Sequence, residues 1–471
     1  MQTASSSVSS AVMCAAVVGA PLLVGSTAPA ATSLWCIVLG MGLAAADPAP
    51  LRPVQRQWLW LPVVVALAYG AVLAAQQLLP DWLGLPADPV WGRASKLLGR
   101  PLDGSVAIVR DQPLLSVGAP LVALMAAVLG FFVGADRARA KTVLDVVAWS
   151  GAAIALFAIV SHLINPAKLF WWDKTAYHGA LTTPFVNRNA AALYYGVCAI
   201  VGALRFWHLL RPRLSAGPLS LTGVMEALPG LLQFQTLTVA AAPLLCLCAV
   251  LLTASRAGTV LALAGQVLAF TLFFWRDLPR RFGPASALVL GGLVALIVLQ
   301  VLGGSAGGRF NEHGMVDEGR LDTYRATLRM IADHPWLGVG LGGFQYAFPA
   351  YRTGNLWGIW DRAHNVLLEI AAEGGIPLAL VVVLAWILVL LLLLHGVRQR
   401  RRDTIFPVAG LTVAGAALIH AMMDFSLQIP GFSIPAMALI GVGAAQSFVT
   451  RKQIGEISWV TGNGALKAVP N

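Results

Sequence analysis

The stretch RFNEHGMVDEGRLDTYRATLRMIADHPWLGVGLGGFQYAFPAYRTGNLWGIWDRAHNVLLEIAAEGG (residues 309–375) is the one long polar segment of a chain that is otherwise strongly apolar. It holds six arginines, at positions 309, 320, 325, 329, 352 and 362. A polar loop of this size between apolar segments can keep water, charge and chemistry together at a membrane surface. We therefore expect the rest of the chain to be the scaffold that holds this loop in place.

The composition of the chain points to a membrane protein. Of its 471 residues 58% are hydrophobic and only 11% are charged, which is too little charge to cover the surface of a soluble protein. A membrane-spanning helix needs about 20 apolar residues. Such runs lie at about 11–30, 32–46, 57–79, 113–134, 143–164, 187–204, 237–254, 258–275, 285–303, 375–395, 405–423 and 431–448. We predict an all-α, polytopic membrane protein with about twelve transmembrane helices and one large periplasmic loop with short helices.

The distribution of charge predicts how these helices are oriented. If the N-terminus is cytoplasmic, the loops on that side hold 18 basic and 7 acidic residues, and the opposite side holds 14 of each. The whole formal net charge of +11 then lies on one face, as the positive-inside rule requires. The large polar loop is therefore expected on the outer face.

We expect four consecutive segments along the chain. Residues 1–180 would carry the first five transmembrane helices with their outer loops, and residues 181–302 helices six to nine. Residues 303–374 would form the large loop. Residues 375–471 would carry helices ten to twelve and a cytoplasmic tail.

The large loop has recognisable parts of its own. Apolar residues at helical spacing predict a helix over 320–331, with Leu321, Tyr324, Leu328 and Ile331 on one stripe. Pro335 ends it. The glycine-rich run 338–344 must be a turn, and we expect its glycines to allow close approach between the loop and the membrane helices. No strand precedes this run, so a nucleotide-binding role has little support.

His364 is the first candidate for chemistry. It lies at the outer start of the tenth span, with Asn365 beside it. A neutral imidazole there can act as general base on a sugar hydroxyl. Equally, it can be a helix-capping histidine that bonds a loop carbonyl, and the residues alone leave both interpretations open. We expect Glu369 and Glu373, which lie deeper, to fix helices rather than to take a proton.

Two arginines complete the candidate site. Arg188 and Arg256 lie at the outer starts of the sixth and eighth spans, where the helix dipole and free N–H groups favour an anion. Arginine binds phosphate oxygens in a bidentate fashion. The alternative is that both snorkel to lipid headgroups. We find no zinc motif, P-loop or dinucleotide fingerprint, so we expect neither a metal nor an organic cofactor.

Three blocks of the sequence resemble one family. HPWLGVGLGGF (residues 334–344) followed by AHNVLLE (residues 363–369) is similar to the signature of the O-antigen ligase and polymerase superfamily. FVNRN (residues 185–189) and SRAG (residues 255–258) resemble two further blocks of that family. Together the blocks cover roughly residues 180–380, so the first four spans carry no part of the resemblance.

The resemblance implies a metal-independent, inverting glycosyltransferase of the bacterial inner membrane. Such enzymes take a glycan from undecaprenyl pyrophosphate at the periplasmic face. Ligases pass it to a lipid A–core sugar, whereas polymerases extend a lipid-linked glycan or build exopolysaccharide. By this likeness His364 is the proposed base, and Arg188 and Arg256 match the arginines thought to hold the pyrophosphate. Asn365, in the block 363–369, and Arg320, with which the same signature begins, are expected to help bind substrate.

A transporter with twelve spans is a different class of function that the composition also allows. Against it, the two halves of the chain show no evident repeat, because the long polar loop lies between the ninth and tenth spans only. Ionisable residues are also scarce at mid-membrane depth. Because topology accounts for the net charge, we do not expect nucleic acid as a partner.

Overall fold

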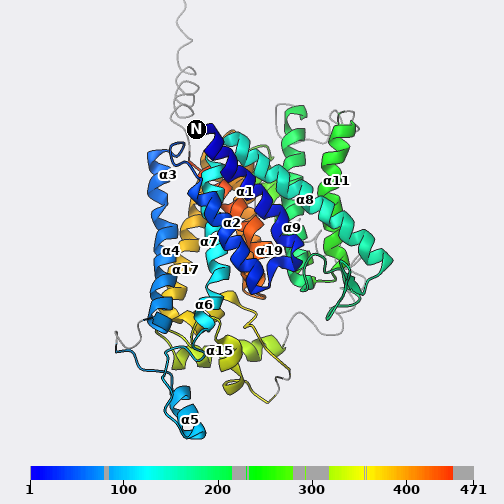
Figure 1. The fold of residues 1–471 in the computed structure, drawn as a ribbon. Coiled ribbons are helices and arrows are strands. Elements are labelled where there is room, and N and C mark those ends of the chain that lie inside the picture. The colour runs from blue at the N-terminus through cyan, green and yellow to red at the C-terminus, as the bar shows by residue number, and fades with distance from the viewer. Residues whose placement is uncertain are drawn as a thin grey trace, which may run out of the picture.

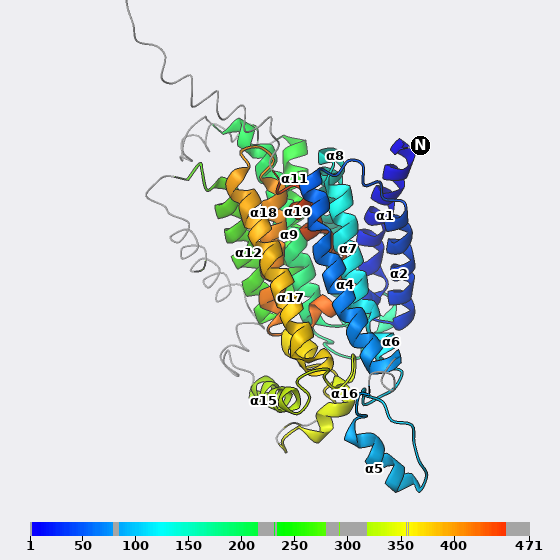
Figure 2. The same cartoon turned by 90° about the vertical axis from the view of Figure 1, so that its left-hand side faces the viewer.

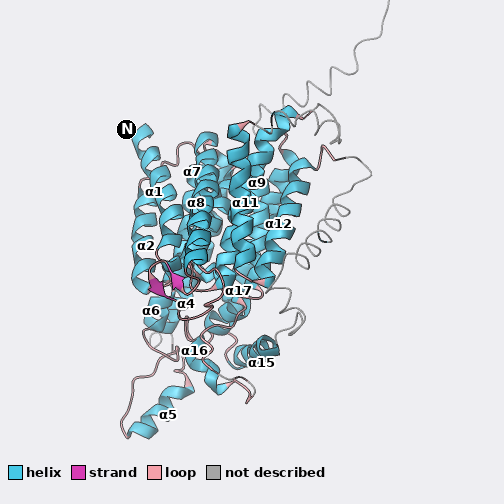
Figure 3. Ribbon diagram, turned by 90° about the vertical axis from the view of Figure 1, so that its right-hand side faces the viewer, coloured by secondary structure: helices cyan, strands magenta, loops and turns pink. Residues whose placement is uncertain are grey.

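The computed structural model is a bundle of helices, with one two-stranded hairpin among the described residues (Figures 1 and 3). It describes residues 2–78, 84–214, 233–278, 318–354 and 358–448, together with residues 230, 292 and 356. The α-helices are α1 (Gln2–Leu22), α2 (Pro29–Ala44), α3 (Pro53–Trp58), α4 (Trp60–Leu73), α5 (Pro89–Leu98), α6 (Gln112–Ser116), α7 (Gly118–Gly134), α8 (Arg137–Ile164), α9 (Arg188–Leu210), α11 (Phe234–Leu252), α12 (Arg256–Phe274), α15 (Glu318–Asp333), α16 (Phe344–Ala347), α17 (Val366–Gln399), α18 (Ile405–Ala421) and α19 (Pro430–Ala445). Short 3-10 and π turns lie at Val24–Ser26, Ala74–Leu78, Arg211–Arg213, Phe348–Ala350 and Ser426–Gln428, and β1 (Lys168–Leu169) pairs with β2 (Trp172–Asp173).

The helices confirm an all-α, polytopic membrane protein. Among the described residues, seven helices are long and apolar enough to cross a membrane, and four shorter apolar helices accompany them. These eleven correspond to eleven of the predicted spans. The remaining span, predicted at 285–303, lies outside the described residues, as do residues 303–317 of the large loop and the tail from 449 on.

Small residues let the central helices pack closely. α19 is buried along almost its whole length and lies against α7 (Figure 1). A Cβ at Gly441 of α19 would collide with the backbone of Ala127 in α7, so only glycine permits this approach. Close backbone contact of this kind drives helix association in membranes, because lipid chains are as apolar as leucine and give no hydrophobic advantage.

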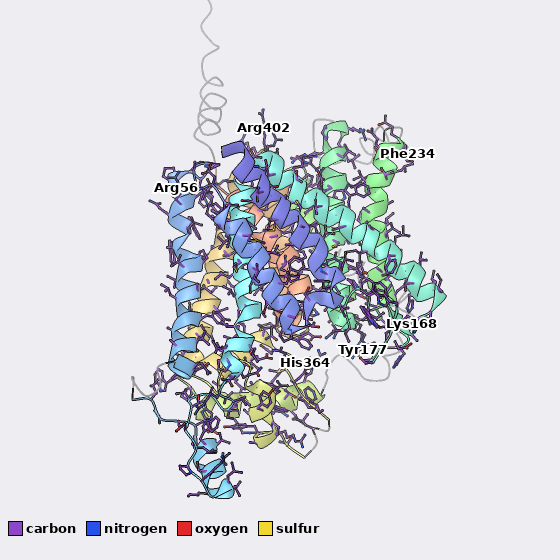
Figure 4. The ribbon with its side chains drawn as sticks, viewed as in Figure 1. Arg56, Lys168, Tyr177, Phe234, His364 and Arg402 are labelled. Carbon is purple, nitrogen blue, oxygen red and sulfur yellow. The ribbon has the colours of Figure 1, made fainter. Side chains whose placement is uncertain are left out.

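The loops predicted to be cytoplasmic meet at one end of the bundle. Ion pairs join Arg137 to Asp403 at 2.8 Å and Arg211 to Asp277 at 2.8 Å. Arg402 lies at this end, and His364 lies at the other (Figure 4). These basic loops therefore share one end of the bundle, and the side of the membrane that they face stays a prediction.

The tenth predicted span differs from expectation at its start. The helix α17 begins at Val366 rather than near residue 375, and it bends at Gly375, where φ is +85°. Its first part belongs to the end of the bundle that holds His364, where α15 and α16 pack against it (Figure 2). The bend therefore separates a short outer segment, which carries Glu369 and Glu373, from the long apolar span.

Candidate active site

His364 lies in a strained turn just before α17. Its φ is +52°, a left-handed value that costs a non-glycine residue roughly 1–3 kcal/mol. The hydroxyl of Tyr324 lies 3.1 Å from the carbonyl oxygen of His364 and 3.2 Å from that of Met422, so it ties this turn to the end of α18. These hydrogen bonds therefore hold the backbone of His364 in a conformation that the chain alone would avoid.

Asn365, not His364, caps the helix. The side-chain oxygen of Asn365 accepts the backbone N–H of Leu368 at 3.1 Å, as an N-cap residue does. Its amide nitrogen donates to the carbonyl oxygen of Met422 at 3.2 Å. The interpretation of His364 as a helix-capping residue is therefore wrong, and its ring is directed elsewhere.

The ring of His364 faces a buried carboxylate. Its Nδ1 lies 3.3 Å from Oδ1 of Asp424, which is 1% exposed. Burial alone would raise the pKa of Asp424, but the hydrogen bond with His364 and the nearby imidazole of His420 hold the pKa well below its usual value. With the carboxylate ionised, Nδ1 carries the hydrogen and Nε2 is left as the basic nitrogen. The His364 side chain remains 23% exposed, so Nε2 can reach a substrate.

Aromatic rings complete the surroundings of the imidazole. The ring of Trp360 lies edge-on at 5.6 Å between centroids, and Phe425 follows at 5.3 Å. They restrict the rotation of the imidazole. His364 thus has its position set by a turn, its tautomer set by a carboxylate and its rotation limited by two rings.

Asp424 also joins the other two sequence blocks to His364. Its Oδ2 accepts Nδ2 of Asn189 at 2.6 Å, and Oδ1 of Asn189 accepts the hydroxyl of Ser255 at 2.8 Å. Ser255 is the N-cap of α12, and Asn187 is the N-cap of α9. A single chain of hydrogen bonds therefore connects the starts of α9 and α12 with the histidine, although the three blocks are far apart in sequence.

Arg188 and Arg256 are the first residues of α9 and α12, as predicted. Both side chains are half-buried. The guanidinium of Arg188 lies 5.0 Å from the ring centroid of Tyr177, and its buried Nε has no hydrogen-bond partner among the described residues. Two cations at two helix N-termini, next to uncharged Asn189 and Ser255, form a setting that favours an anion.

Arg320 lies on α15, one turn before Tyr324. The predicted helix is confirmed, and its apolar stripe is only partly buried, with Ile331 8% exposed. Leu321 is 40% exposed and Leu328 is 54% exposed, whereas Ala326 and Met330 are fully buried. Thr323 and Thr327, rather than the two leucines, lie on the buried face of the helix. Their hydroxyls donate to carbonyls of the preceding turn and so need no water.

The glycine-rich run packs against α17, as the sequence predicts. The N–H of Val339 donates to the carbonyl of Ala372 at 2.9 Å. Gly338 has a φ of +66°, and a Cβ there would collide with the backbone of Glu373. Glu373 in turn accepts the N–H of Phe344 at 3.0 Å through its carboxylate. Loop and helix thus form one rigid body beneath the site.

The buried carboxylate of Glu369 holds the segment before His364 in place. It accepts Nη1 of Arg362 at 3.1 Å, the N–H of Ala363 at 2.8 Å and Nε2 of Gln428 at 2.9 Å. Burial would lower the pKa of Arg362, but the charges of Glu369 and Glu373 raise it on balance. Both glutamates therefore hold helices and loops together, and the expectation that neither takes a proton stays a prediction.

The sequence analysis missed Asp424 and Asn189 as members of the site. Asp424 lies in the turn between the last two predicted spans, and no sequence motif surrounds it. An ionisable residue at the end of an apolar span was the available signal, because such residues are rare and usually functional. Within the described residues, no group of three His, Cys, Asp or Glu side chains is placed to hold a metal ion.

Comparison with known proteins identifies the central part of the chain. Residues 241–383 match the family model described as O-antigen ligase. The matched region contains Arg256, Arg320, His364 and Asn365, whereas Arg188 and Asp424 lie outside it. None of the curated proteins compared with the chain matches it. Residues 241–383 therefore carry an O-antigen ligase domain, which supports the O-antigen ligase and polymerase superfamily for this chain.

Proposed function

We propose that the protein is a ligase-type glycosyltransferase that acts at the periplasmic face of the bacterial inner membrane. It moves a glycan from undecaprenyl pyrophosphate to a hydroxyl of a lipid A–core sugar. The observation that carries the proposal is the His364–Asp424 pair, which lies at the outer end of a membrane bundle and is bonded through Asn189 to the arginine-bearing starts of α9 and α12.

His364 is the general base in this proposal. Its Nε2 accepts the proton of the acceptor hydroxyl while that oxygen attacks the anomeric carbon of the donor sugar. The bond between this carbon and the pyrophosphate oxygen breaks, and the electron pair leaves with the pyrophosphate. Attack from the face opposite the leaving group inverts the anomeric configuration. The imidazolium, stabilised by Asp424, then returns its proton to the released pyrophosphate or to water.

The arginines stabilise the leaving group. Pyrophosphate is already a good leaving group, so positive charge serves it better than an acid. Arg188 and Arg256 supply this charge without a metal ion, and a guanidinium does not lose its proton beside a lipid chain. We assign Asn365 and Arg320 to substrate binding next to His364. The proposed site thus draws on three of the four expected segments of the chain, namely 181–302, 303–374 and 375–471.

Purified protein in nanodiscs tests the proposal. Two acceptors are offered separately with the undecaprenyl-pyrophosphate-linked glycan: lipid A–core and a second molecule of lipid-linked glycan. We expect glycosylated lipid A–core, and a loss of about 10²-fold or more in His364→Ala at equal folding and donor binding. Elongation of the lipid-linked glycan alone would make the protein a polymerase instead. Transfer at wild-type rate by His364→Ala would remove the histidine from the mechanism.

A further inference from the structure

A groove of about 540 Å³ runs through the bundle on the other side of the site. It lies between α4, α7, α17 and α19. Its lining runs from Trp58, two residues after Arg56 at the end with the basic loops, to Arg362, two residues before His364 at the other end (Figure 4). Its size is that of an ordinary ligand pocket. The groove thus spans the apolar part of the protein from one end to the other.

The polarity of the groove changes along its length. Residues such as Val65, Val128 and Ile440 line its membrane part, and most of its walls there are apolar. Charged side chains line it only at the outer end, where Arg362 and Glu373 face it. This gradient matches an amphipathic molecule whose hydrocarbon chain lies in the bilayer and whose polar head lies beside the site.

The groove is separate from the two arginines at the helix starts. Neither Arg188 nor Arg256 lines it, and α17 and α18 lie between α12 on one side and α4 with α7 on the other (Figure 2). The groove does reach the histidine turn, because Arg362 and Val366 both line it and flank His364 in the chain. His364 therefore lies between two places where a lipid can approach.

We infer that this groove holds the hydrocarbon chain of the acceptor lipid and that Arg362 binds an anionic group on the acceptor's head. The inference rests on the proposed function. An inverting transfer places the attacking and leaving oxygens on opposite faces of the anomeric carbon, and the base lies beside the attacking oxygen. The acceptor therefore approaches on the side of His364, which the groove reaches through Arg362 and Val366. The arginines of α9 and α12 suit the pyrophosphate of the donor. The groove is therefore available to the acceptor.

Arg362 suits a phosphate or carboxylate of the acceptor. Its Nη1 is held by Glu369, which fixes the direction of the guanidinium, and the side chain is 40% exposed. A guanidinium has further donors in a planar fork and can bind an anion while it keeps this ion pair. The acceptor class is therefore a lipid with an anionic head and at least one long hydrocarbon chain.

Filling the groove tests whether it holds the hydrocarbon chain of the acceptor. Ala123→Trp in α7 and Ala385→Trp in α17 place an indole in the groove, and Ala66→Trp in α4 is the matched control, since Ala66 is exposed and lies outside the lining. In nanodiscs we expect both groove variants to raise KM for the acceptor about tenfold or more. KM for the donor and the retention of labelled donor should match Ala66→Trp. Loss of donor binding instead, or unchanged constants for both lipids, would overturn the inference, whereas transfer by the wild type tests the proposed function separately.

Removal of the charge of Arg362 tests whether this residue binds the anionic head of the acceptor. The double variant Arg362→Gln, Glu369→Gln removes both partners, so no buried carboxylate is left unpaired. The wild type should favour a phosphate-bearing acceptor over its dephosphorylated form by about tenfold in kcat/KM, and the double variant should lose this preference. If it keeps the preference, or if the wild type has none, Arg362 does not bind the acceptor's anionic group. Normal thermal unfolding of the variant is the control for folding.

Discussion

Asp424 gives His364 its orientation and its tautomer. A histidine that was merely exposed at the membrane surface would rotate freely and present either nitrogen. With Nδ1 held at 3.3 Å from a buried carboxylate, Nε2 is the nitrogen left for a substrate, and we expect the carboxylate to stabilise the imidazolium that the proposed proton transfer forms. The carboxylate therefore acts through the histidine and not on the substrate.

Asp424→Asn keeps the shape of the side chain and removes its charge. We expect kcat/KM for transfer to fall about 10²-fold, because the tautomer is no longer selected and the imidazolium loses its counter-charge. In the background of His364→Ala the same substitution should cost little more, since residues that act as a unit are not additive. Initial rates in nanodiscs measure both. A further large loss in the double variant would mean that Asp424 acts independently of His364.

The depressed pKa of Asp424 also affects stability. A carboxylate whose pKa is lower in the folded protein stabilises it above the pKa of the unfolded chain, about 3.9, and this contribution is lost as the pH falls through the folded value. We therefore expect the difference in Tm between wild type and Asp424→Asn to be largest at neutral pH and to shrink below about pH 4. Thermal unfolding in detergent at several pH values measures it. A difference that stays constant down to pH 2 would contradict this assignment.

Arg256→Lys tests whether the planar guanidinium of Arg256, and not only its charge, binds the pyrophosphate. Lysine keeps the charge but loses the planar guanidinium, so bidentate contact with pyrophosphate is lost. We expect KM for the donor to rise about tenfold or more, which corresponds to 1.4 kcal/mol. Arg93→Lys on α5, an exposed arginine outside the site, is the control. Equal donor KM in both variants would leave Arg256 with a role at the lipid headgroups only.

At the level of elements, the glycine-rich loop and α17 depend on each other. Gly338 has φ of +66° and no room for a Cβ beside Glu373. Gly338→Ala should therefore destabilise the protein by about 2–4 kcal/mol, through the left-handed backbone and the collision together. The midpoint of thermal unfolding in detergent measures this change. Gly354→Ala, where a Cβ meets nothing within 4 Å, should leave it unaltered.

What the sequence could predict at this level follows from local chemistry. Hydrophobic runs predict spans because lipid satisfies no backbone group, and the arginines at helix starts followed directly from the span boundaries. The apolar stripe predicted for α15 is only partly buried, because threonine can satisfy its own hydroxyl within a helix and take the place of leucine on the buried face. The contact of His364 with Asp424 could not be predicted, since residues this far apart in sequence leave no local pattern that pairs them.

At the scale of the whole molecule, one end of the bundle collects the basic loops and the other the site. We expect the site end to face the periplasm. In a variant without native cysteines, Thr353→Cys should react with an impermeant thiol reagent added to intact spheroplasts. Gln399→Cys should react only after lysis. The reverse pattern of labelling would invert the topology and contradict the proposed location of the site.

The hydrogen bonds of Asp424 have a consequence for biosynthesis. A chain emerges from the ribosome with its N-terminal part first. The starts of α9 and α12 and the turn of His364 are all made earlier, but the residue that joins them follows α18 and is made only afterwards. A nascent chain can thus insert most of its helices while its histidine still lacks its partner. If the proposed base needs Asp424, we expect the protein to become competent only when its last hairpin, α18 with α19, has entered the membrane.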